Sequence, residues 1–128
     1  MTQQKTEGVR VRVETFYQPD HSNPIYSEYL FAYRITIENK LDVPVKLLRR
    51  KWHIHEGTGL KRIVEGEGVV GQQPTIIPGG SYQYSSAANI KTDMGKMFGY
   101  YEMQDLYNHK KMIVQIPAFY LIAPFKMN

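Results

Sequence analysis

Cysteine is absent from the 128-residue sequence. Disulfides, thiolate metal sites and cysteine nucleophiles are therefore excluded, and the absence fits a reducing compartment, so we expect a cytoplasmic location. Long apolar runs are absent too. No stretch approaches the roughly 20 residues of a membrane-spanning helix, and the opening residues MTQQKTEGVRVRV lack the apolar segment of a secretory signal. We expect no membrane association.

An excess of charge of one sign is nearly absent as well. The formal net charge is +4, which is compatible with an anionic partner but far below that of a dedicated nucleic-acid binder. We expect no specific nucleic-acid partner.

Tyrosine and the turn-forming residues are abundant, with ten tyrosines, ten glycines and seven prolines. Apolar and polar residues alternate in many short segments, which indicates strands with one wet face. Strands are predicted at residues 9–17, 29–38, 45–56, 60–65, 82–84, 96–103 and 111–122. The alternation changes phase near Leu47 and Leu48, which predicts a bulge, and Pro117 requires a second bulge or an edge position.

These strands and the lack of an amphipathic helix predict an all-β fold, a fibronectin type III or immunoglobulin-like antiparallel β-sandwich of about seven strands. One domain is expected over residues 9–124, with a flexible tail at residues 1–8 and a C-terminal tail at 125–128. The run from Ile76 through Pro78 and Gly79 to Tyr82 is similar to the corner of such sandwiches, where a tyrosine bonds to the backbone. Trp52 is expected in the core.

The segment EGEGVVGQQP carries the spacing of a nucleotide-binding loop at Gly66, Gly68 and Gly71. A phosphate-binding loop of that type opens a helix, yet here Pro74 follows and only strand patterns surround it. Two interpretations stay open. The glycines permit a tight loop between β elements, or the N–H groups of Gly66, Glu67, Gly68 and Gly71 form a concave nest for an anion.

Several runs together resemble the ApaG family: LLRRKWHIHEGTG, VEGEGVVGQQPTIIPGGSYQYSS, MGKMFGYYEM and VQIPAFYLIAP. The resemblance extends from about Val9 to Pro124. Two departures are the loss of a histidine before Trp52, where this chain has Arg50 and Lys51, and the run QDLYNH in place of an Asp-Gly turn. The resemblance implies a fibronectin-type sandwich without an established enzymatic activity. Related domains of eukaryotic F-box proteins look like interaction modules, and bacterial members are associated with diadenosine tetraphosphate metabolism and with cobalt and magnesium tolerance.

Two groups of side chains are candidate sites. Basic residues on two strands predict a basic hairpin that either binds phosphate or an acidic partner, or only protects a strand edge from aggregation: Arg49, Arg50, Lys51, Lys61 and Arg62. His53 and His55 share one face of a strand and are weak candidates for metal ligands, because a third ligand is unspecified.

No serine stands in a nucleophile elbow and no carboxylate pair stands out, so no catalytic residue and no cofactor is predicted. We expect a non-catalytic binding module that engages a protein through an exposed sheet edge or loops, with a homodimer as one form. The alternative is a sensor that binds a phosphate-bearing small molecule or a divalent cation at the glycine loop and the basic hairpin.

Overall fold

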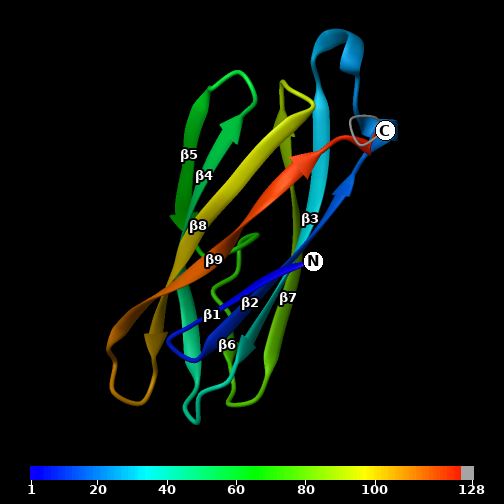
Figure 1. The fold of residues 1–128 in the computed structure, drawn as a ribbon. Coiled ribbons are helices and arrows are strands. Elements are labelled where there is room, and N and C mark those ends of the chain that lie inside the picture. The colour runs from blue at the N-terminus through cyan, green and yellow to red at the C-terminus, as the bar shows by residue number, and fades with distance from the viewer. Residues whose placement is uncertain (125–128) are drawn as a thin grey trace.

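Two antiparallel sheets packed face to face make up the protein, as the computed structural model shows for residues 1–124 (Figure 1). The first sheet has the order β1-β2-β3-β7, formed by Thr2–Thr6, Val9–Tyr17, Tyr29–Asn39 and Ser81–Ile90. The second has the order β5-β4-β8-β9, formed by Lys61–Glu67, Val45–Glu56, Met94–Asp105 and Lys111–Ile122, with β6 (Thr75–Ile76) paired to the start of β4. Two 3-10 turns, η1 (Pro19–His21) and η2 (Pro24–Tyr26), lie between β2 and β3. The predicted all-β, fibronectin-type sandwich is confirmed.

Alternate residues of every long strand fill the space between the sheets. Val9, Val11, Ile35 and Ile37 are fully buried, as the period of two predicts. The Trp52 ring, 3% exposed, packs edge-on against Tyr33 and Phe119, so its predicted place in the core is confirmed. No helix of the described residues is long and apolar enough to cross a membrane.

The N-terminus differs from the predicted flexible tail over residues 1–8. Thr2–Thr6 form β1, which pairs with β2 through a two-residue turn at Glu7 and Gly8, both with positive φ (54° and 82°). The sequence TQQKT is polar throughout, so it carries no alternation to reveal a strand. β1 lies beside β9, where the Gln115 N–H donates to the Thr6 hydroxyl (3.4 Å), so this flank of the sandwich is closed. The predicted C-terminal tail, residues 125–128, lies outside the described residues.

The strand pairing of the second sheet contains two register shifts. The shift between Leu47 and Arg49 confirms the predicted bulge, and it turns Trp52 and Ile54 towards the core. The other falls between Met97 and Gly99, opposite Pro117 in β9. β9 is also the last strand in the hydrogen-bonded order of its sheet. Pro117 therefore has both the bulge and the end-strand position that a proline in a sheet requires.

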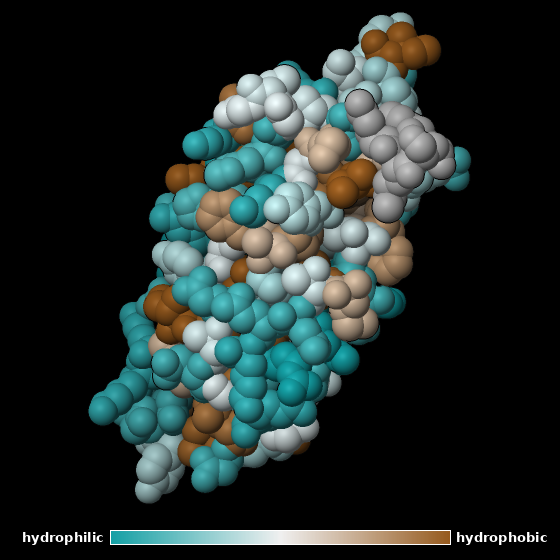
Figure 2. All heavy atoms as spheres, viewed as in Figure 1, coloured by the Kyte–Doolittle hydropathy of each residue, from teal (hydrophilic) through white to brown (hydrophobic). Residues whose placement is uncertain are grey.

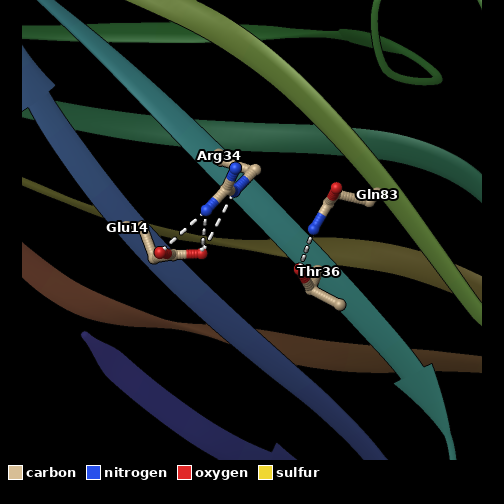
Figure 3. A network of polar contacts seen from close by, with 4 residues as sticks. All are labelled: Glu14, Arg34, Thr36 and Gln83. Carbon is tan, nitrogen blue, oxygen red and sulfur yellow. Dashed lines mark hydrogen bonds and ion pairs between the residues drawn. The ribbon is translucent and has the colours of Figure 1, made fainter.

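The outer face of the first sheet is polar and carries hydrogen bonds and ion pairs between its strands (Figure 3). The Arg34 guanidinium donates to the Glu14 carboxylate at 2.9–3.1 Å, and Gln83 donates to the Thr36 hydroxyl at 3.0 Å. Further ion pairs join Arg12 and Lys40 to Glu38.

A buried pair of tyrosines joins the two sheets. The hydroxyls of Tyr84 on β7 and Tyr101 on β8 are 2.5 Å apart, and burial raises the pKa of both above that of an ordinary tyrosine. Each hydroxyl therefore has the other as a partner in a place closed to water.

Tyr101→Phe is expected to destabilise the fold by about 1–3 kcal/mol, because the Tyr84 hydroxyl is then buried without this partner. Removing both hydroxyls, in the variant with Tyr84→Phe and Tyr101→Phe, is expected to cost clearly less than the sum of the two single changes. Urea unfolding of the four proteins in a double-mutant cycle measures the coupling. Strictly additive losses would contradict the pairing.

Candidate functional site

The glycine loop connects two strands and opens no helix. β5 ends at Glu67 and β6 begins at Thr75, so a nucleotide-binding loop of the kind that opens a helix is excluded. Between them Val70 (φ 46°) and Gly71 (φ 76°) form a tight turn closed by two hydrogen bonds between Val69 and Gln72 (2.8 and 2.9 Å). Two consecutive positive φ values are the mark of a type I′ turn.

The anion nest is not supported by this geometry. The Gly68 N–H donates to the Leu48 carbonyl at 2.8 Å and the Val69 N–H to the Gln72 carbonyl, so neither is available to a ligand. Gly66 lies within β5, where a Cβ would meet the Arg50 guanidinium at 3.2 Å, and a Cβ on Gly68 would overlap the Gln72 carbonyl. Close packing explains both glycines.

The predicted basic hairpin is divided between two faces of its sheet. Because β4 pairs Arg50 with Gly66 and Ile54 with Arg62, Arg50 and Arg62 share the face of Trp52, which is turned towards the first sheet. Arg49, Lys51 and Lys61 occupy the opposite, outer face. The expected single patch of five basic residues is therefore wrong. The bulge in β4 decides which arginine faces inwards.

A cleft opens between β5 and β7, on the flank opposite β1 and β9. It has a volume of about 220 Å³, and Arg50 and Arg62 line it together with Tyr33, Trp52 and Ser86. A second hollow of about 520 Å³ shares Arg62 and Asn89 with it and extends to Tyr26, Glu28 and Lys91. Tyr33 and Ser86 come from the first sheet, and no pattern in the sequence pointed to them.

Both arginines of the cleft bond to backbone carbonyls rather than to carboxylates. Arg50 Nη1 donates to the carbonyls of Glu67 (3.1 Å) and Gly68 (2.9 Å), and Arg62 Nη2 crosses to the Asn89 carbonyl on β7 (2.5 Å). Within residues 1–124, the ion pairs involve neither guanidinium. Two positive charges thus lie in the cleft without a countercharge.

The two histidines share the outer face of β4, as predicted, but around an aromatic ring. His53 stacks on Phe98 (ring centres 4.9 Å apart) and His55 meets it edge-on (5.0 Å). Partial desolvation, with Lys61, His53 and Lys96 adding positive charge, lowers the pKa of His55. No three potential metal ligands of the described residues gather in one place, so the structure lends the metal prediction no third ligand.

The run predicted as a corner leads into β7 through a turn. Pro78 and Gly79 (φ 76°) occupy a turn closed by the Gly80 N–H and the Ile77 carbonyl (2.9 Å). The corner tyrosine of such sandwiches belongs to the sixth strand. Tyr82 is the second residue of β7, which is the fifth strand of the sandwich when the N-terminal β1 and the two-residue β6 are not counted. The hydrogen bonds found within residues 1–124 include none from its hydroxyl, and its ring lies 6.4 Å from that of Tyr84. The corner role predicted for Tyr82 is therefore not supported.

β5 is an exposed end strand (Figure 1). Ile63 is 57% exposed and Val64 39%. The Leu60 carbonyl accepts from Glu56, and the Gly68 N–H donates to Leu48, so even-numbered residues direct their backbone groups towards β4. Because direction alternates along a strand, Lys61, Ile63 and Glu65 direct theirs to the free edge, whereas the carbonyl of Glu67 accepts from Arg50.

Taken together, the fold and these surfaces define a fibronectin-type β-sandwich with one closed flank and one open, basic flank. The family model described as "ApaG domain" matches residues 19–105. Protein ApaG of Escherichia coli strain K12 is 46% identical over 116 residues, which cover 91% of this chain and 92% of that protein. Protein ApaG of Agrobacterium fabrum is 44% identical over 119 residues, covering 93% and 91%.

A crystal structure titled as a putative ApaA protein from Bordetella pertussis superposes with a TM-score of 0.88 at 35% identity, covering 91% of this chain and 94% of that one. The C-terminal domain of wzt, at 8% identity and a TM-score of 0.52, shares the fold alone. This chain belongs to the ApaG family.

Proposed function

We propose that this ApaG-family chain is a non-catalytic binding module that associates with a protein strand through the free edge of β5, and that a second copy of β5 fits this edge. The observation that carries the proposal is the exposed row of backbone groups at Lys61, Ile63 and Glu65. An extended segment can add to such an edge through main-chain hydrogen bonds.

The sequence of β5 is complementary to itself in one antiparallel register. With Ile63 opposite Ile63 of the second copy, each Lys61 lies opposite a Glu65. These are residues whose backbone groups face the edge, so the register also satisfies the hydrogen bonds. Opposite charges across a strand pair contribute roughly 0.2–1 kcal/mol each, and the symmetric contact closes on itself as a dimer.

Glu65→Pro is expected to abolish this association, since it removes an edge-facing N–H and leaves the ladder to β4 intact. Sedimentation velocity over a concentration series measures it, and Glu65→Ala is the matched control for loss of the carboxylate. Equal association of the proline and alanine variants would count against strand pairing.

A charge exchange tests the register itself. Lys61→Glu alone places like charges opposite each other and is expected to weaken the dimer, whereas adding Glu65→Lys restores opposite charges and the association. A wild-type chain that stays monomeric at all concentrations rejects the second copy as the partner.

The alternative from the sequence, a sensor of a phosphate-bearing small molecule or a divalent cation at the glycine loop and the basic hairpin, has less support. The N–H groups of Gly68 and Val69 already bond within the chain. Of the five predicted basic residues, three lie on the sheet face opposite Arg50, the arginine that bonds to this loop.

A further inference from the structure

The cleft between β5 and β7 combines a small volume with two uncompensated positive charges. Its floor is formed by core residues, among them Trp52 (3% exposed) and Met97 (1%). Arg50 and Arg62 reach it from inward positions on β4 and β5 that are separated by the pair of Trp52 and Val64. Guanidinium groups beside low-dielectric walls attract anions more strongly than the same groups in open water.

The backbone contacts of the two arginines fix their position without neutralising them. Arg50 is held by the carbonyls that end β5, and Arg62 by the Asn89 carbonyl across the cleft. A guanidinium carries five N–H donors, so donors remain after these bonds. Arginines already held in place lose less conformational entropy when a ligand binds.

Two neutral hydroxyls, of Tyr33 and Ser86, line the same cleft. Burial raises the pKa of Tyr33, although its hydrogen bond with Ser86 and the charge of Arg50 oppose the rise. The phenol therefore keeps its proton near neutral pH and can donate it in a hydrogen bond.

From these observations we propose that the cleft binds a doubly charged oxyanion, the phosphate group of a small phosphate monoester, with Arg50 and Arg62 as its charged ligands and Tyr33 and Ser86 as neutral donors. Two guanidiniums match two negative charges, whereas a carboxylate neutralises only one. About 220 Å³ is below the usual range for a whole ligand, so the cleft holds the head group.

The remainder of the ligand extends past Arg62 into the neighbouring hollow. Besides Arg62, the lining of this hollow holds one cation, Lys91, and one anion, Glu28, and Tyr26 and Asn89 supply polar groups. This hollow therefore suits an uncharged, polar remainder. The site and the edge of β5 use different groups of the same flank, because Arg50 and Arg62 contribute inward-facing side chains and the edge is formed by backbone groups.

Titration calorimetry at constant ionic strength tests the proposal with three probes: inorganic phosphate, glycerol 3-phosphate and acetate. The wild-type chain is expected to bind both phosphates and to bind acetate at least tenfold more weakly. Tighter binding of glycerol 3-phosphate than of inorganic phosphate identifies a monoester site, and the reverse order overturns the monoester assignment. Acetate that binds as well as phosphate overturns the selection for a double charge.

Arg62→Gln is expected to weaken phosphate binding at least tenfold. Lys51→Gln, which removes the same charge from the outer face, is expected to leave the affinity within about twofold. Equal losses in the two variants would show attraction by net charge alone and overturn the site. The site is also overturned if the wild type binds neither phosphate probe at 10 mM, roughly the weakest affinity of interest. Arg50→Lys provides a second variant. It keeps the positive charge at a position that also bonds to the end of β5, so it is expected to fold and to bind phosphate more weakly than the wild type.

Discussion

Gly99→Ala is expected to destabilise the protein by about 3 kcal/mol or more. Gly99 lies at the second register shift, opposite Trp52. A Cβ there would overlap the Lys51 carbonyl oxygen and lie 3.1 Å from the Trp52 Cα. These are backbone atoms of the neighbouring central strand, so relief requires β4 and β8 to separate, and overpacking of this kind is costly. Urea unfolding measures the loss.

Gly71→Ala is the matched control for this change. Gly71 has positive φ, but nothing lies within 4 Å of its Cβ position. The expected loss is about 1–2 kcal/mol, the strain of a left-handed alanine alone. If Gly99→Ala costs no more than Gly71→Ala, close strand approach is not what position 99 requires.

Asn39→Asp is expected to cost about 3–5 kcal/mol at neutral pH. The Asn39 side chain is fully buried. Its amide donates to the carbonyls of Val43 (2.8 Å) and Ile76 (3.0 Å), and its oxygen accepts from Leu41 (2.9 Å). A carboxylate would direct negative charge at two carbonyl oxygens, and a buried charge without a partner is strongly destabilising.

The loss in Asn39→Asp has a defined pH dependence. Burial and the facing carbonyls raise the pKa of the new carboxyl in the folded state above the value of about 3.9 in the unfolded chain. Its proton-bound form is therefore favoured by folding, and the stability deficit relative to wild type shrinks as the pH falls through the folded-state pKa. Urea unfolding at pH 7.5 and 4.5 measures this.

Asn108→Asp serves as the control, because Asn108 is exposed and uses only its side-chain oxygen, which accepts from Lys110. Its effect is expected to stay within about 0.5 kcal/mol at both pH values. A deficit in Asn39→Asp that does not change with pH would contradict the buried-charge explanation.

Strands with one wet face were predictable from this sequence, and strands without that contrast were not. VRVRV and YRITI alternate clearly, so β2 and β3 were found close to their observed limits. β7 continues to Ile90 through SSAAN, where small residues show no alternation of apolar and polar side chains. β6 has two residues, which is too short for any periodicity to be read.

For the candidate site, residue types were predictable and their directions were not. The basic residues of β4 and β5 were identified, but their side depends on the shift between Leu47 and Arg49. A slip of one residue moves every following side chain to the other face. Tyr33 and Ser86 reach the cleft only because β3 and β7 pair in the facing sheet, a long-range arrangement that local pattern does not encode.

The surface shows where apolar side chains remain outside the core. Figure 2 shows a hydrophobic side chain at the tip of the loop between β2 and β3, at the upper right, above a mostly polar front. Ile25 and Tyr26 of this loop are 88% and 73% exposed. Tyr26 also lines the hollow beside Arg62, so this loop borders the open flank.

The strand β1 has a consequence for how many molecules can join. With β1 beside β9, the described part of the second sheet keeps β5 as its one uncovered end. Two copies that pair there use up both such ends, and a third finds none in that sheet. If the proposed pairing of two β5 strands forms, repeated addition along this sheet therefore ends at two copies.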